Sequence, residues 1–183
     1  YTLIISNSNG IESEISDPVV VNVNQNPLVS MDKTDVSCFG GLDGSASVVI
    51  ISGTGTMTYL WSNYTTSQTA GNLAAGCCSV KVTDEYACEI NPSVLIFQPD
   101  RIEIIETITK ASCPDAADGK IDLSTSGGTG AYTFNWNATS GSNSSSLSGL
   151  EFGSYSVSVS DANNCIIDKT YEVGYLREEC FDV

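Results

Sequence analysis

The chain has 183 residues, with 22 acidic side chains, 7 basic ones and a formal net charge of −15. The basic residues are scattered along it, which argues against nucleic acid and anionic membrane surfaces as partners. There is no histidine and no apolar run of the roughly 18 residues that a spanning helix needs, so neither the common catalytic dyads nor membrane insertion is expected.

One pattern is present twice. Three segments recur 75 to 77 residues further along: Cys38–Gly44 as Cys113–Gly119, Tyr59–Trp61 as Phe134–Trp136, and Leu73–Asp84 as Leu150–Asp161. A period near 75 is too long for a solenoid repeat and suits a complete small domain. Such a domain has a thin core, so we expect cross-links to stabilise it.

Short runs rich in Val, Ile, Thr and Tyr, separated by Gly, Asn and Asp turns, predict strands throughout. The first copy is expected to have strands near 28–36, 45–51, 57–62, 68–73, 78–83 and 93–98. The second is expected to have them near 102–109, 120–125, 131–136, 144–150, 154–160 and 168–174. Six or seven short strands per copy predict an all-β fold of tandem immunoglobulin-like antiparallel β-sandwiches.

Residues 1–26 resemble the end of another such domain. Tyr1–Asn7 lines up with Tyr155–Asp161, and Asn7–Gly10 then forms a hairpin turn that leads into a closing strand at Ile15–Asn24. Because Tyr1 lies inside an apolar run, we expect the chain to be a piece of a longer protein.

Prolines after the closing strands, at Pro27 and Pro99, stiffen short connections, so the domains should form a semi-rigid rod. The predicted divisions are the C-terminal hairpin of a preceding β-sandwich at 1–26, two copies of the module at 27–99 and 100–176, and a linker toward a C-terminal secretion domain at 177–183.

Alternation along the strands predicts the core. One set of inward side chains lies on the strand with the aromatic residues, namely Met57, Tyr59 and Trp61 in the first copy and Tyr132, Phe134 and Trp136 in the second. The other set lies on a later strand, namely Cys78, Val80 and Val82 in the first copy and Tyr155, Val157 and Val159 in the second. We expect the two sets to be the facing halves of each core. An exposed sugar-stacking platform is the alternative for the aromatic residues, but their strict period of two favours core packing.

Four of the seven cysteines occupy matched positions. Cys38 and Cys113 precede an Asp-Gly pair, whereas Cys88 and Cys165 follow a later aspartate. The simplest interpretation is one disulfide within each copy, Cys38–Cys88 and Cys113–Cys165, each closing a loop worth ~4 kcal/mol. Such bonds place the chain outside the reducing cytosol. Four free buried thiols are the alternative.

The other three cysteines have no counterpart in the second copy. Cys78 is predicted to be a buried free thiol and Cys77 to point outward. Cys180 is expected to pair with a cysteine beyond this chain.

Aspartates and glycines mark the turns. Asp43-Gly44 and Asp118-Gly119 indicate tight turns in which glycine adopts a positive φ. Asp84 and Asp161, with their neighbours Glu85 and Asn163, offer oxygen ligands for calcium, but their spacing does not match an EF-hand loop. We therefore expect turn capping and no cofactor, with calcium as the alternative.

The order of Cys113, Asp118-Gly119, Ser126–Trp136 and Leu150–Cys165 resembles the SprB repeat, which recurs many times in giant surface adhesins of gliding Bacteroidota. The resemblance covers roughly residues 28–98 and 101–174. The tail Glu178–Val183 resembles the run-in to the C-terminal domain that directs proteins to the type IX secretion system and anchors them at the outer membrane.

The resemblance implies non-catalytic stalk or spacer repeats of a secreted adhesin, outside the cell and attached to the outer membrane, with roles in gliding motility and surface attachment. The implied partners are neighbouring repeats and the anchoring proteins of the secretion system. A polysaccharide-binding module and the spacer of a secreted exoenzyme are the alternatives, and no constellation of residues supports catalysis. Burial of Trp61 and Trp136 would favour the spacer over glycan binding.

Overall fold

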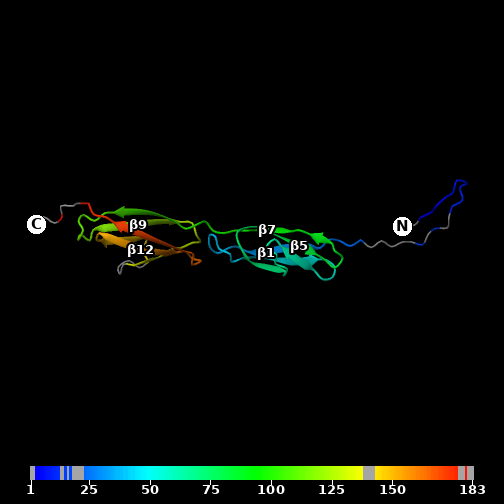
Figure 1. Cartoon of the computed structure of the whole chain (residues 1–183), viewed down its shortest axis with the longest axis horizontal. Coiled ribbons are helices and arrows are strands. Elements are labelled where there is room, and N and C mark those ends of the chain that lie inside the picture. The colour runs from blue at the N-terminus through cyan, green and yellow to red at the C-terminus, as the bar shows by residue number, and fades with distance from the viewer. Residues whose placement is uncertain are drawn as a thin grey trace.

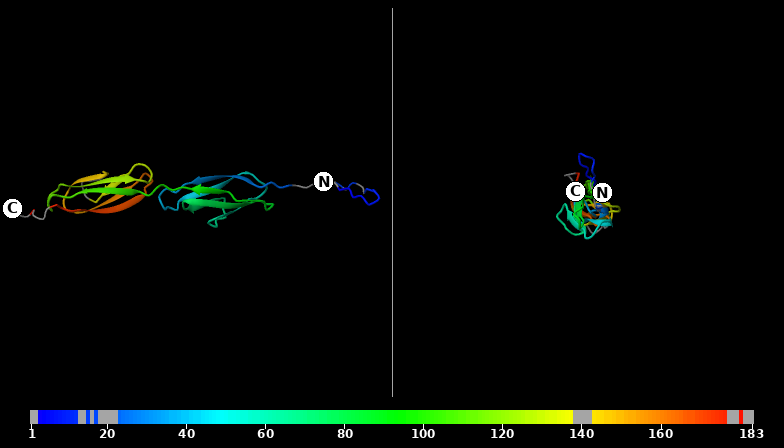
Figure 2. Two further views of the ribbon diagram at one scale, coloured as in Figure 1. Left: turned by 90° about the horizontal axis from the view of Figure 1, so that it is seen from above. Right: turned by 90° about the vertical axis from the view of Figure 1, so that its right-hand side faces the viewer.

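The structure is a computed structural model that describes residues 3–12, 15, 17, 23–137, 143–176 and 180. Two β-sandwiches lie end to end along the long axis of a rod (Figure 1), and the view turned by 90° shows the same arrangement (Figure 2). Within the described ranges the regular structure is all strand, and no helix there is long and apolar enough to cross a membrane. The expected all-β fold of tandem antiparallel sandwiches is confirmed.

The first copy of the module, residues 27–99 and called module 1 below, contains two sheets. The first has the order β1 (Leu28–Thr34), β2 (Gly44–Ser52) and β4 (Thr69–Leu73). In the second, the central strand β5 (Gly76–Thr83) pairs with β3 (Thr58–Trp61), β6 (Glu89–Ile90) and β7 (Ser93–Ile96). All of these pairs are antiparallel.

The second copy, residues 100–176 and called module 2 below, has the same arrangement of two sheets. One sheet has the order β8 (Glu103–Thr109), β9 (Gly119–Ser126) and β11 (Ser146–Leu150). The other has the order β10 (Thr133–Trp136), β12 (Gly153–Ser160) and β13 (Ile166–Val173). The long strand β13 occupies the place that module 1 divides between β6 and β7, and β6 is the one strand of the two modules that the sequence did not predict.

The core forms where the alternation placed it. Trp61 and Trp136 are 1% and 6% exposed, and each indole N–H donates to a backbone carbonyl, of Ser67 at 2.8 Å and Ser144 at 2.9 Å. Phe134 is also buried, whereas Tyr59 and Tyr155 are partly buried and pack against the two clusters. The aromatic strand is therefore a core strand and not a sugar-stacking platform.

The predicted arrangement of the two inward sets is wrong. Trp61 pairs with Val80 and Tyr59 with Val82 along the β3–β5 ladder, so the two sets are neighbours in one sheet. The two sets of module 2 are likewise neighbours in one sheet, because Trp136 pairs with Val157 and Phe134 with Val159. The opposite sheet supplies the facing side chains, including Ala46, Val48, Leu73, Ile121, Leu123 and Leu150. Alternation shows which face of a strand is buried, but it does not assign the strand to a sheet.

The prediction of positive φ at Gly44 and Gly119 is also wrong, because both residues begin strands and neither has such an angle. Glycine is required there by a close approach. A Cβ atom would lie 2.7 Å from the carbonyl oxygen of Leu73 in module 1 and of Leu150 in module 2.

A buried carboxylate organises the last hairpin turn of module 2. Asp161 is 4% exposed, and its Oδ1 accepts N–H bonds of 2.9 Å from Asn163 and Cys165. Its Oδ2 accepts a third, of 2.8 Å, from Thr129 in the loop after β9. Burial alone would raise the pKa of Asp161, but these N–H bonds outweigh it and hold the pKa below its ordinary value of 3.8.

We expect Asp161→Ala to lower the free energy of unfolding of module 2 by about 2 kcal/mol at pH 7, because three N–H groups lose a charged acceptor. A depressed pKa stabilises the fold above the ordinary value and loses that contribution as pH falls through the folded-state value, so the difference from wild type should narrow below about pH 4. Urea denaturation at pH 7 and below about pH 4 measures the free energy of unfolding, and Asp168→Ala, at an exposed position, is the control. Equal losses in the two variants would contradict the capping role.

Turn capping also makes a prediction about metal. No group of three or more His, Cys, Asp and Glu side chains in the described part of the chain is arranged to hold a metal ion. Calcium binding, the alternative to turn capping, is untested. Because backbone N–H groups occupy the Asp161 oxygens, we expect excess chelator to leave both melting transitions unchanged in calorimetry. A drop that added calcium reverses would show that the turns bind the ion.

Candidate functional site

The two disulfides do not lie within the copies. Cys38 is bonded to Cys165 of the next module, with a Cα–Cα distance of 5.5 Å and a sequence separation of 127. Cys113 is bonded to Cys180, with a Cα–Cα distance of 5.6 Å and a separation of 67. The predicted pairs Cys38–Cys88 and Cys113–Cys165 are therefore wrong, and so is the expected pairing of Cys180 beyond this chain.

Strand direction explains the correction. Within module 1, Gly76 at the start of β5 pairs with Ile96 at the end of β7, next to the linker, so β5 runs from the linker end to the opposite end. Cys88 follows β5 at that far end, whereas Cys38 lies at the linker end, where it reaches module 2. An eight-residue strand spans about 26 Å, several times the Cα–Cα distance of a disulfide.

Cys77 and Cys78 agree with the prediction, whereas Cys88, which was predicted to be bonded, is not. Cys78 is buried and free, and Cys77 is exposed and free. Cys88 is also free and is partly buried.

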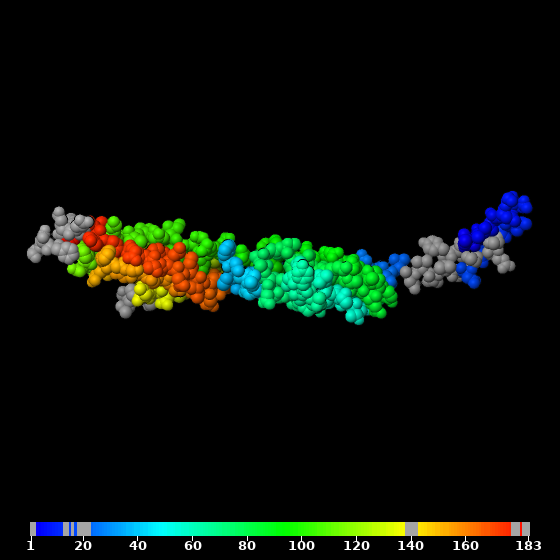
Figure 3. Space-filling model, in the orientation of Figure 1, coloured from blue at the N-terminus to red at the C-terminus, as the bar shows by residue number. Residues whose placement is uncertain are grey.

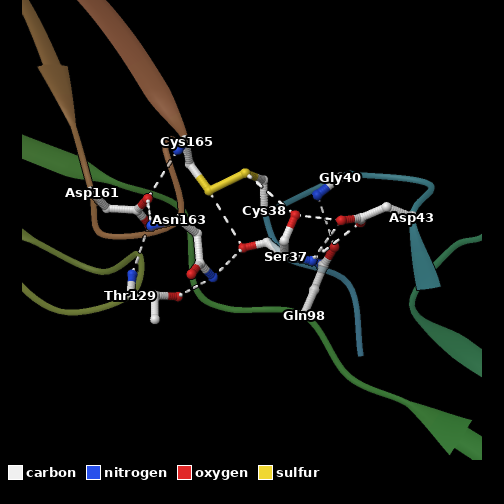
Figure 4. Close-up of a disulfide and its surroundings, with 9 residues drawn as sticks. All are labelled: Ser37, Cys38, Gly40, Asp43, Gln98, Thr129, Asp161, Asn163 and Cys165. Carbon is white, nitrogen blue, oxygen red and sulfur yellow. Dashed lines mark hydrogen bonds between the residues drawn. A yellow bond between two sulfur atoms is a disulfide. The ribbon is translucent and has the colours of Figure 1, made fainter. Parts of the chain in front are cut away.

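On the module 1 side, a short loop holds Cys38 in place (Figure 4). The Asp43 carboxylate accepts hydrogen bonds from both the backbone N–H and the hydroxyl of Ser37, the residue before the cysteine. These bonds keep the pKa of Asp43 below its ordinary value. The N–H of Gly40 donates to Oε1 of Gln98 at 2.8 Å, which ties the loop to the linker.

The same loop occurs in module 2, where Asp118 Oδ1 accepts the N–H of Ser112 at 2.8 Å. Asp43 and Asp118 were predicted as turn residues. They fix the residue that precedes each first cysteine, and this explains why the spacing from cysteine to aspartate is the same in both copies.

On the module 2 side, the hairpin turn that Asp161 caps presents Cys165 to the loop. The turn also contributes the Asn163 side chain, whose Nδ2 donates to the carbonyl oxygen of Ser37 at 3.0 Å and to Oγ1 of Thr129 at 3.3 Å. A covalent bond and a hydrogen bond therefore connect the same two loops (Figure 4).

Figure 3 shows the loop after β1, in light blue, against the orange and red surface of module 2. A cleft of about 540 Å³ lies beside the disulfide, lined by residues of the loop, the linker and the hairpin, including Phe39, Pro99, Arg101 and Ile166. The lining comes from both modules, so the cleft lies at their junction.

Sequence reasoning missed Asn163 and Gln98 as junction residues. Asn163 stands where the first copy has Tyr86, so comparison of the copies gave no sign of its role. The matched cysteine spacing was a usable signal, but it fits bonds from one copy to the next as well as bonds within each copy.

A family model described as SprB repeat matches residues 30–66 and 105–141. No curated protein matches the sequence. The solved structures that are similar to the chain include the following two. The first is the C-terminal 282-residue fragment of intimin, in complex with the intimin-binding domain of the translocated intimin receptor, with a TM-score of 0.39 and 16% identity over 82% of this chain and 64% of that one.

The second is the full ectodomain (Ig1–Ig3) of mouse nectin-like molecule 4, with a TM-score of 0.35 and 12% identity over 83% of this chain and 65% of that one. The chain thus covers less than two thirds of either structure.

The family matches follow the structural repeat. Each match begins in the first strand of its module, β1 or β8, and ends a few residues past the strand that carries the buried tryptophan. The chain therefore carries two tandem copies of the SprB repeat.

Proposed function

We propose that the chain is part of the non-catalytic stalk of a secreted cell-surface adhesin, in which repeats joined end to end hold a binding region away from the cell and carry tension. One observation carries the proposal: the disulfide from Cys38 to Cys165 links β1 of one repeat to β13 of the next. The oxidising surroundings of the cell surface suit such a bond.

The disulfide offers a short path for force. Cys38 follows β1, the strand by which the chain enters module 1, and Cys165 directly precedes β13, the last strand of module 2. Tension applied at the two termini passes along β1, through the two sulfur atoms and along β13. The residues between the two cysteines, which are 127 positions apart, form a closed loop beside this path, and the tension does not extend that loop.

The family supports the finer parts of the proposal. SprB repeats belong to surface adhesins of gliding bacteria, so we propose a role in gliding motility and surface attachment, with export by the type IX secretion system and attachment to the outer membrane. The proposed partners are neighbouring repeats and the anchoring proteins of that system.

The structure favours the stalk over the polysaccharide-binding alternative, because Trp61 and Trp136 are buried and their indole N–H groups are already paired. The third strand of each repeat, which carries these aromatic residues, is thus not available to a sugar ring. The acidic surface, at a net charge of −15, favours the solubility of such a stalk.

In single-molecule pulling, we expect reduction of the oxidised chain to add roughly 440 Å of contour length, which is 127 residues at about 3.5 Å each. Cys38→Ser should add less, roughly 210 Å, because the second disulfide still closes 67 residues and 127 − 67 leaves 60. Cys180→Ser is the matched control and should add nothing, since Cys113 lies inside the larger loop. An oxidised chain as extensible as the reduced one would rule out the force path.

A replacement experiment tests the spacer role in cells. We expect cells in which residues 27–176 are replaced by two unrelated sandwich domains of equal length, cross-linked across their junction, to keep surface attachment and gliding at near wild-type levels. Deletion of the same residues should shorten the stalk and weaken both. Loss of attachment in the replacement strain, with export intact by surface labelling, would show that the repeats themselves bind.

A further inference from the structure

The free thiol of Cys88 occupies the same structural position as the bonded Cys165. Asp84 Oδ1 accepts N–H bonds from Tyr86 at 2.9 Å and Cys88 at 2.8 Å, as Asp161 Oδ1 does from Asn163 and Cys165 in the second repeat. The residue before each cysteine also has the same left-handed backbone, with φ of 62° and 61°. The two turns therefore present their sulfur atoms in the same way.

The surroundings of Cys88 resemble an unused junction. The thiol is partly buried at the end of module 1 that faces away from module 2. Beside it, the Asp84 carboxyl is 5% exposed, and its Oδ2 is buried without a hydrogen-bond partner. In module 2 the matching oxygen of Asp161 accepts an N–H bond. Burial and the nearby Asp84 charge raise the pKa of the Cys88 thiol, which keeps it protonated and slow to react without a partner.

A third copy of the turn lies 77 residues before Asp84. Asn7 Oδ1 accepts N–H bonds from Asn9 at 3.0 Å and Ile11 at 3.1 Å, and Gly10 has the left-handed φ, at 73°. The Ser6–Glu12 bridge flanks this turn. Residues 3–12 thus have the local structure of the last hairpin of a repeat, directly before module 1. The closing strand expected at Ile15–Asn24 falls mostly outside the described residues.

The junction between the two modules suggests a rule for joining repeats. The first cysteine of one repeat bonds to the hairpin cysteine of the next, as Cys38 does to Cys165. At the far end of module 2, Cys113, the first cysteine of that repeat, is already bonded to Cys180. Among the described cysteines at repeated positions, Cys88 is the one left without a bond.

We propose that Cys88 is the attachment site for a disulfide from the first cysteine of another SprB repeat, docked on the end of module 1 that carries the Asp84 turn. The partner cysteine stands five residues before an aspartate that is followed by glycine, as Cys38 and Cys113 do. The inference extends the stalk proposal by naming the partner of this end of the chain.

The bond forms by oxidation of two thiols. Each sulfur loses its proton, and the two electrons pass to the disulfide of a thiol–disulfide oxidoreductase of the cell envelope, which becomes a dithiol. The new S–S bond then repeats the Cys38–Cys165 clamp at the preceding junction.

Peptide mapping tests the pairing. The protein is isolated from its source cells, alkylated without reduction and digested with trypsin, which releases Cys88 in residues 82–101, apart from Cys77 and Cys78. We expect this peptide to be cross-linked to a cysteine outside residues 1–183, in a Cys-x-x-x-x-Asp-Gly sequence. Cys38–Cys165 should be cross-linked in the same sample, whereas the exposed Cys77 should be alkylated.

A pair of variants separates a specific partner from chance oxidation. Cys88→Ser should leave the partner cysteine open to alkylation, and Cys77→Ser should leave the map unchanged. An alkylated Cys88 in the cell-derived protein, or a bond from Cys88 to Cys77, Cys78 or a cysteine in any other sequence, would overturn the inference. The readout is chemical, so failure of the stalk proposal in the replacement strain would leave this result unaffected, and the reverse also holds.

Discussion

The disulfide between Cys38 and Cys165 is the constraint on which the arrangement of the two repeats depends. Each sandwich has about 75 residues and buries only about 60% of its unfolded surface, so little free energy is available to hold two such domains in a fixed relation. The repeats supply that relation through two loops, each fixed by one carboxylate. Asp43 holds the residue before one cysteine and Asp161 holds the other cysteine directly, so both sulfur atoms are positioned before they bond.

Much of this fold could be predicted from the sequence, because the duplication shows what the module requires. Strand positions, the burial of Trp61 and Trp136, and the capping role of Asp161 all follow from local pattern. The pairing of cysteines could not be predicted in the same way. Two copies of a matched spacing are equally consistent with bonds inside a repeat and bonds between repeats. Only strand direction, which puts Cys88 and Cys38 at opposite ends of module 1, decides between them.

The remaining errors have a common cause, since each concerns a contact between segments distant in sequence. Gly44 is needed because the carbonyl of Leu73 approaches closely and not because of its own φ. The two inward sets share a sheet because β3 pairs with β5, which alternation along either strand does not reveal. Asn163 bridges the junction through a neighbour 126 residues away, and no local signal marks it. Local rules therefore predicted the elements, and tertiary contacts determined the site.

A bond between repeats does something for a stalk that a bond within each repeat would not. A disulfide inside a sandwich would limit the unravelling of that sandwich but leave the linker near Pro99 as a single, unsupported connection. The Cys38–Cys165 bond lies in parallel with this linker, so the junction between the two repeats has two covalent connections, and bending it requires both to move. Because the same bond removes the sequence between its ends from the loaded path, stiffness at the junction and resistance to unravelling arise from one cross-link. In the proposed stalk, a repeat with so small a core would then carry tension without greater stability of its own.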